Sequence, residues 1–200
     1  METNFTQLSQ LDRPGLISLA TLHSAVMHTL LADLGLPIVV RYYECAQTDP
    51  AVISFCAFSE TGEFEGWAIG CADPAGLYKK LRQPPIWFAG QMLRLAFTRP
   101  ATLVDLLRSL IAPSEPNLLK PGQIELTYMG VAPGAQGRGL GKAMLAAFMQ
   151  ASRQAGYTSA AISVETENLT TVRLHTRAGF QITKTFREGR FERHRMECTL

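Results

Sequence analysis

Apolar residues recur at three- and four-residue spacing near the start of the chain. They are Leu16, Leu19, Ala20, Val26, Met27, Leu30 and Leu34. This spacing predicts one amphipathic helix that ends at Gly35, and Pro37 stands where a second helix can begin. The valines and tyrosines of residues 38–47 favour a strand by propensity.

Two shorter apolar segments follow, at residues 51–58 and 64–71. The glycine in the connection 59–63 suits an antiparallel hairpin, so both segments are predicted to be strands. From Ala75 to Pro113, prolines divide a helical pattern into short pieces. Residues 113–123 carry three prolines and a glycine, which predicts a loop or linker.

The last third of the chain has the most regular pattern. It predicts a strand at 124–131, a helix at 139–155, a strand at 159–164, a helix at 168–178 and strands at 180–187 and 190–198. This order implies an α/β fold in which a mixed sheet carries helices on its faces. We expect a single domain over residues 1–200, with residues 75–123 as a helical insertion and linker.

Composition narrows the class of protein. Of the 200 residues, 46% are apolar and 18% are charged, which is the globular range and excludes a disordered chain. The four cysteines lie far apart, without a C-x-x-C pair or a histidine at ligand spacing, so neither a disulfide scaffold nor a metal site is expected. The start of the chain lacks a basic leader, and the stretch from Leu16 to Leu34 is too polar for a membrane span. We therefore expect a soluble cytoplasmic protein with no membrane partner.

Charge is distributed unevenly along the chain. Residues 1–100 hold 7 basic and 9 acidic side chains, whereas residues 101–200 hold 12 and 8. The positive second half suits an anionic ligand, with ordinary surface charge as the alternative. Nucleic-acid binding is not expected, because a duplex binder usually shows a dense basic stripe.

One segment carries recognisable binding chemistry. Residues 131–142 lead from the predicted strand into the helix, with glycines at 137, 139 and 141. Alternate glycines allow successive backbone N–H groups to point at one centre beside a helix N-terminus, which predicts a pyrophosphate cradle. Arg138 and Lys142 can add charge. The P-loop pattern fails because Ala143 follows Lys142, and the G-x-G-x-G spacing is not the Rossmann fingerprint.

The segment from Gln136 to Gly141 resembles the Q/R-x-x-G-x-G/A acetyl-coenzyme A signature of the Gcn5-related N-acetyltransferase (GNAT) family. The preceding Val131-Ala132-Pro133 is similar to the family's entry to that motif. Downstream, Asn168 opens a helix, and Arg177-Ala178-Gly179-Phe180 resembles the family's closing Gly-Phe. The resemblance is close over residues 120–200 and looser over the first helices and the 51–71 hairpin.

The resemblance implies a GNAT-type mixed, mostly antiparallel sheet whose fourth and fifth strands splay apart, with an acyl-CoA-binding core at 124–200. Backbone groups around Met129 and Val131 would pair with pantetheine, and Asn168 would line the splayed strand ends. The pyrophosphate would meet the amides of Gln136, Gly137, Arg138, Gly139, Leu140, Gly141 and Lys142. The resemblance also favours a helix at 38–47, with Tyr42 and Tyr43 near the acceptor site.

Two residues are candidates for proton transfer. Glu125 matches the strand position of the carboxylate base in some family members, with a solvent-facing or salt-bridged glutamate as the alternative. His175 stands where many relatives carry a tyrosine that donates to the coenzyme sulfur. An imidazolium is a competent acid for a thiolate, although the thiolate can also leave without a protein acid.

These features predict transfer of an acetyl or short acyl group from coenzyme A to a primary amine. Direct attack is expected, because no Cys or Ser at the glycine motif can act as a covalent carrier. The acceptor stays open between small molecules and protein amines, and a homodimer is compatible with the sequence. Arg187, Arg190, Arg193 and Arg195 are either surface residues or contacts for an anionic acceptor or coenzyme phosphate. The alternative function is a non-catalytic acyl-CoA-binding module.

Overall fold

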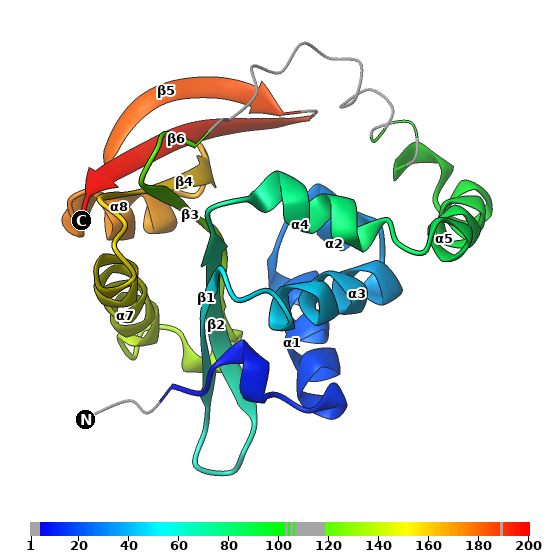
Figure 1. The fold of residues 1–200 in the computed structure, drawn as a ribbon, viewed down its shortest axis with the longest axis horizontal. Coiled ribbons are helices and arrows are strands. Elements are labelled where there is room, and N and C mark those ends of the chain that lie inside the picture. Colours follow the sequence, from blue (N-terminus) through cyan, green and yellow to red (C-terminus); the bar gives the residue numbers. More distant parts are fainter. Residues whose placement is uncertain (1–4, 103, 105, 107–118, 189) are drawn as a thin grey trace.

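The computed structural model describes residues 5–102, 104, 106, 119–188 and 190–200. Its centre is a six-stranded sheet with the order β1-β2-β3-β4-β6-β5 (Figure 1). The strands are β1 (Val52–Phe58), β2 (Phe64–Cys71), β3 (Gln123–Val131), β4 (Ser159–Glu165), β5 (Gln181–Glu188) and β6 (Phe191–Thr199). Neighbouring strands are antiparallel except for β3 and β4, which are parallel. The predicted mixed, mostly antiparallel sheet is confirmed.

Helices cover both faces of this sheet (Figure 1). The described helical elements are η1 (Leu8–Gln10), α1 (Arg13–Val26), α2 (Leu30–Asp33), α3 (Leu36–Gln47), α4 (Pro74–Leu81), α5 (Pro85–Thr98), η2 (Pro133–Ala135), α7 (Leu140–Gln154) and α8 (Leu169–Arg177). The first helices, α1 to α4, gather on one side, and α7 packs against β1, β2 and β3 on the other. Helices therefore enclose the middle of the sheet.

The helix predicted up to Gly35 is two helices, and the prediction of one was wrong. Met27 has extended backbone angles at the end of α1. The hydroxyl of Thr29 then accepts a hydrogen bond from the Ala32 amide and begins α2. Both helices contribute apolar residues to the same core cluster, so the apolar spacing continues across the break. Periodicity alone therefore does not reveal where the first helix ends.

Residues 38–47 are helical, as the family resemblance implied and against their strand propensity. Pro37 lies in the first turn of α3, where its fixed φ is favourable. The buried residues Ile38, Val39, Tyr42, Tyr43, Cys45 and Ala46 form one broad face of the helix. Burial of that face overrides the modest intrinsic preference of β-branched and aromatic residues.

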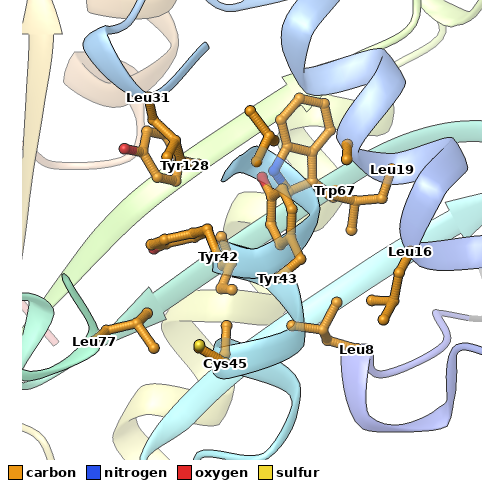
Figure 2. Packing of buried hydrophobic residues seen from close by; sticks show 14 of the residues in the cluster. Leu8, Leu16, Leu19, Leu31, Tyr42, Tyr43, Cys45, Trp67, Leu77 and Tyr128 are labelled. Atoms are coloured by element: carbon orange, nitrogen blue, oxygen red, sulfur yellow. The ribbon is translucent and has the colours of Figure 1, made fainter. Parts of the chain in front are cut away.

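The core consists of two clusters on opposite sides of the sheet. The first joins α1, α3 and α4 to β2 and is rich in aromatic rings, including Tyr42, Tyr43, Trp67 and Tyr128 (Figure 2). The second joins α7 to the other face through residues such as Phe148, Ile124 and Leu126. β3 contributes to both clusters, because its side chains point to both faces of the sheet.

The segment between β2 and β3 begins with the helical pieces α4 and α5, as the prolines predicted. Most of the loop expected at 113–123 lies outside the described residues. Within the described part of the chain, no helix combines the length and hydrophobicity that crossing a bilayer requires. The described side chains also contain no group of three or more His, Cys, Asp or Glu residues that could bind a metal ion.

Candidate functional site

The parallel strands β3 and β4 separate soon after they begin. Residues Gln123–Glu125 pair with Ser159–Ala161, but β3 continues to Val131 and β4 to Glu165. Beyond Glu125 the β4-facing side of β3 therefore has no strand partner, and this stretch includes Met129 and Val131. The splay that the resemblance implied for the fourth and fifth strands of the family is present, and in this chain it separates the third and fourth, β3 and β4. It leaves backbone groups in the middle of the sheet without a strand partner and available to a ligand.

The glycine-rich turn lies at the end of β3. Gly137 and Gly139 have φ angles of 77° and 83°, in the left-handed region. A side chain added at either position would meet no atom within 4 Å, so the backbone faces open space. Gly139 precedes α7 without any side-chain cap, which leaves the helix N-terminus uncapped. Amides and helix dipole together form a positive cradle that fits a phosphate.

The charged residues of the cradle differ in their surroundings. Arg138 donates to Glu65 of β2 at 2.7 Å, whereas Lys142 is exposed. The side chain of Gln136 donates to the carbonyl oxygen of Val131 at 3.3 Å and ties the turn to the end of β3. Glu65, which sequence reasoning did not connect with the cradle, therefore forms an ion pair with one of the two cationic side chains of the cradle.

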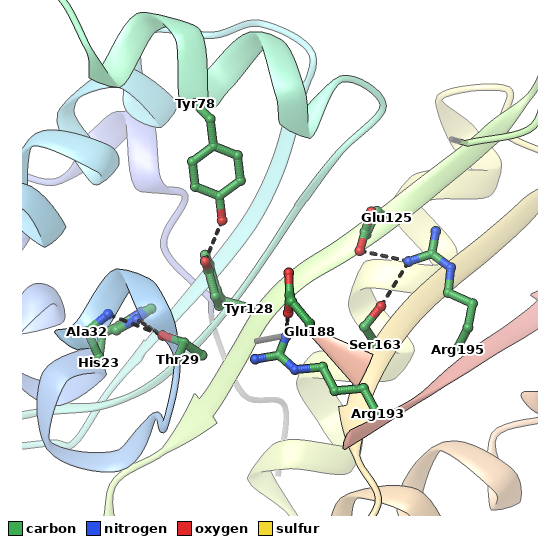
Figure 3. Close-up of polar contacts among 10 residues, drawn as sticks. All are labelled: His23, Thr29, Ala32, Tyr78, Glu125, Tyr128, Ser163, Glu188, Arg193 and Arg195. Carbon is green, nitrogen blue, oxygen red and sulfur yellow. Dashed lines mark hydrogen bonds and ion pairs between the residues drawn. The ribbon is translucent and has the colours of Figure 1, made fainter. Parts of the chain in front are cut away.

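A β-bulge changes the direction of the side chains along β3. In the pairing with β2, Ile69 is opposite Tyr128 and Gly70 is opposite Leu126, so Thr127 is the extra residue. Without the bulge, Glu125 and Tyr128 would face opposite sides of the sheet. With it, both face the side of α1 and α3, on the same strand (Figure 3).

Glu125 is paired and largely buried. Its Oε1 accepts a hydrogen bond from Arg195 Nη1 at 2.8 Å, and the same nitrogen donates to Ser163 Oγ at 3.2 Å (Figure 3). Only 15% of the Glu125 side chain is exposed. Burial raises the pKa of this carboxyl above its usual range, although the Arg195 charge opposes the shift. A carboxylate with a raised pKa is a stronger base, so the salt bridge and the predicted base role are compatible.

A cavity of about 270 Å³ lies beside Tyr128. Residues of α2, α4, α5, β3 and the β5–β6 hairpin line it, including Thr29, Leu31, Leu81, Tyr78, Glu188 and Arg193. The hydroxyls of Tyr78 and Tyr128 are 2.6 Å apart (Figure 3). Arg190 of the hairpin forms an ion pair with Asp33 of α2 at 2.7 Å. This ion pair joins α2 to the β5–β6 hairpin, and both elements contribute residues to the cavity wall.

Behind the cavity wall lies a buried histidine. His23 Nε2 is 3.4 Å from Thr29 Oγ1, and Nδ1 is 2.8 Å from the hydroxyl of Tyr43. Burial lowers the pKa of His23 to about 4. The imidazole is therefore neutral at physiological pH and serves the packing and hydrogen bonding of the aromatic cluster.

Proteins of known family share the sequence pattern and the fold that place the splayed strands, the cradle and the cavity together. Residues 38–180 match the model of the acetyltransferase (GNAT) family. The chain belongs to this family. It is 31% identical over 179 residues to the mycothiol acetyltransferase of Mycobacteroides abscessus, a match that covers 86% of this chain. The match covers 56% of the mycothiol acetyltransferase, so the chain spans just over half the length of that relative.

Solved structures show the same fold. The PaiA N-acetyltransferase of Thermoplasma acidophilum, in complex with coenzyme A, superposes with a TM-score of 0.60 at 10% identity, over 100% of both chains. The ribosomal-protein-S18-alanine N-acetyltransferase of Escherichia coli gives a TM-score of 0.60 at 12% identity, covering 98% of this chain and 93% of its own. At such low sequence identities, the similarity shows that the fold is shared and no more.

Two predicted site residues of the GNAT core lie on α8. Asn168 caps this helix, since its Oδ1 accepts a hydrogen bond from the Thr171 amide at 3.1 Å. His175 is fully buried and packs edge-on against Phe180. Its Nδ1 lies 2.8 Å from the Thr171 carbonyl oxygen, to which only a protonated nitrogen can donate. Burial lowers the pKa of His175, so the neutral ring carries a lone pair on Nε2, which has no partner among the described residues.

Sequence reasoning and structure differ most on the cavity side of the GNAT fold. Tyr42 and Tyr43, expected near the acceptor site, are fully buried in the aromatic cluster, and the Tyr42 ring packs against Tyr78 and Tyr128, which line the cavity. Tyr78 itself lines the cavity, and its position in the proline-divided helical segment gave no signal of this. From the sequence, Arg193 was only one of four candidate arginines. The structure shows that the side chains of Arg193 and Arg195, both on β6, are largely buried.

Proposed function

We propose that this chain transfers an acetyl or short acyl group from acetyl-coenzyme A to a primary amine. The observation that carries the proposal is the position of Glu125 and Tyr128 between two features, the splayed strands with their cradle and the cavity. Membership of the GNAT family and the similarity to a mycothiol acetyltransferase support acetyl transfer.

The cradle fits the pyrophosphate of coenzyme A. The amides from Gln136 to Lys142 would bind the phosphate oxygens, because the open space at Gly137 and Gly139 admits them to the backbone. Backbone groups near Met129 and Val131, which lack a strand partner on the β4 side, would hold the pantetheine arm. Asn168, at the open end of β4, would line the same channel. Bound in this way, the coenzyme supplies a thioester between the splayed strands.

Glu125 is the proposed base. The acceptor binds as an ammonium and must lose a proton before its nitrogen can attack the acyl carbon. The raised pKa of the Glu125 carboxylate favours proton removal, and Arg195 keeps the carboxylate oriented. As the new C–N bond forms, the C–S bond breaks and the electron pair leaves with sulfur as a thiolate.

Direct attack is supported by the state of the cysteines. Cys45, Cys56, Cys71 and Cys198 are all buried. Burial raises the pKa of Cys71, which is opposite Glu125 in the sheet, to about 11. A buried thiol with such a pKa is a poor nucleophile, so an acyl-enzyme intermediate on this residue is disfavoured.

His175 was expected to protonate the leaving thiolate. A neutral imidazole whose Nδ1 proton is donated to Thr171 has no proton to give from Nε2. These surroundings favour the second alternative, in which the thiolate leaves without a protein acid. His175 remains a candidate only if ligand binding changes its protonation.

The test is release of free coenzyme A thiol from acetyl-coenzyme A in the presence of a panel of primary amines. We expect amine-dependent thiol release together with an N-acetylated product detected by mass spectrometry. Tight coenzyme A binding by calorimetry without thiol release across the panel would instead favour a non-catalytic acyl-CoA-binding module.

A further inference from the structure

The charged groups of the cavity bear on what the acceptor carries besides its amine. Arg193 extends from β6, and only 14% of its side chain is exposed. Its Nη1 donates to Glu188 at 2.9 Å, but its Nε is buried with no partner among the described residues. An unsatisfied N–H on a buried guanidinium is unfavourable. An oxygen-rich anion that contacts two guanidinium nitrogens would satisfy it.

Glu188 balances only part of the positive charge in this cavity. Its side chain is 51% exposed, so the carboxylate is partly solvated while its partner guanidinium is not. Arg82 also lines the cavity, which gives two guanidinium groups and one carboxylate among its described charged residues. A ligand with several positive charges would meet repulsion here, whereas one carboxylate would restore the balance.

The remaining wall is largely apolar. Leu30, Leu31, Leu34, Leu81 and Phe88 also line the cavity. A volume of about 270 Å³ accepts a small molecule with a side chain of a few carbon atoms. The wall therefore favours a ligand with a short apolar group.

Arg193 lies within electrostatic range of the reacting centre. Burial raises the pKa of the Glu125 carboxyl and of the Tyr78 hydroxyl, and the positive charge of Arg193 acts on both groups and opposes these shifts. A small molecule bound to Arg193 through a carboxylate would thus place a nearby amine beside the face that Glu125 and Tyr128 share.

We propose that the cavity takes an acceptor that combines a primary amine, a carboxylate and a short apolar side chain, and that Arg193 determines this specificity. The proposal rests on the proposed function, since it names the class of amine that the same site acetylates. Arg193 is a specificity residue here, because it contacts the part of the acceptor that does not react.

A matched pair of substrates tests the proposal without any mutation. Leucine and 3-methylbutylamine differ only in the carboxylate, and spermidine represents a polycationic amine. We expect kcat/KM for leucine to exceed that for either amine by at least about tenfold. A preference for 3-methylbutylamine or spermidine would overturn the proposal while supporting N-acetyltransfer itself.

Variants then assign the preference to Arg193. Arg193→Gln should lower kcat/KM for leucine by about tenfold or more and leave 3-methylbutylamine within about twofold of the parent. Arg187→Gln is the matched control, because Arg187 is exposed on the neighbouring strand and does not line the cavity. An equal loss for both substrates in Arg193→Gln would indicate a structural role and contradict the assignment.

Direct binding separates this proposal from the proposed function. If no amine releases thiol, calorimetry with the protein saturated with coenzyme A compares leucine and 3-methylbutylamine as ligands. Tighter binding of leucine, lost in Arg193→Gln, would support the carboxylate site even in a protein without transferase activity. Equal or undetectable binding of both would refute it.

Discussion

Replacing Gly139 with valine tests the cradle directly. Gly139 has a φ of 83°, so any other residue is strained, by about 1–2 kcal/mol for a left-handed conformation. No atom lies within 4 Å of the position that the new Cβ would take, so the fold itself meets no clash. The side chain would project into the space where phosphate oxygens approach the amides.

The structure offers a matched control at the other end of the same helix. Gly156 follows α7, has a φ of 87° and also has nothing within 4 Å of the position that an added Cβ would take. Gly156→Val should therefore lose a similar amount of stability. Because Gly156 lies at the opposite end of α7, the new side chain is far from the cradle. Comparing the two variants cancels the backbone strain and isolates the effect on the ligand.

The expected difference in affinity follows from the hydrogen bonds at stake. A backbone amide bonded to a charged phosphate contributes about 1.5–3 kcal/mol. Losing one such bond weakens coenzyme A binding by about tenfold to a hundredfold. Titration calorimetry gives the dissociation constants, and thermal unfolding checks that both variants fold. If Gly139→Val and Gly156→Val bind coenzyme A equally well, the cradle is not at this turn.

Three further predictions concern proton transfer and stability. Glu125→Gln should lower kcat by about a hundredfold or more with little change in coenzyme A affinity, and a rate within twofold of the parent would mean that another group is the base. In the wild-type protein, the pKa of the acid limb of the pH–rate profile should lie above the usual glutamate range. His175→Phe and His175→Tyr should both keep single-turnover rates near the parent if the thiolate leaves unaided, whereas a loss in Phe that Tyr restores would establish a proton donor. Because the pKa of His23 in the folded state is about 4, below its unfolded value, its contribution to stability is present above pH 6.5 and is lost as the pH falls toward 4. Equilibrium unfolding should show that the free energy of unfolding falls by about 3 kcal/mol over this range in the wild type but not in His23→Gln. Equal pH dependence of the two proteins would disprove this prediction.

The parts of the site that could be predicted from the sequence are local in the chain. The turn at 136–142 is encoded by glycine spacing within seven residues, because left-handed φ angles and helix initiation depend on neighbouring residues. The splay and the helix at 38–47 required the family resemblance, since propensity favoured a strand for the latter. Local patterns thus located the cradle but not what surrounds it.

The rest depends on contacts between distant segments. The Arg190–Asp33 ion pair joins residues 157 positions apart, and Glu65 reaches Arg138 across 73. The bulge at Thr127 exists only in the register with β2, because the residue itself carries no bulge signal. Without that register, a strict alternation along β3 would have placed Glu125 and Tyr128 on opposite faces.

The origin of the cavity walls has a consequence for how substrate range can change. The cradle is a single continuous turn, whereas the cavity is assembled from α2, α4, α5, β3 and the β5–β6 hairpin. Substitutions in α2 or the hairpin can therefore alter the acceptor without touching the segment that meets the phosphates. A library that randomises residues 29–34 together with 188–193 would sample new acceptors on a constant acyl-donor scaffold, and the Asp33–Arg190 pair marks two positions that need to be varied jointly.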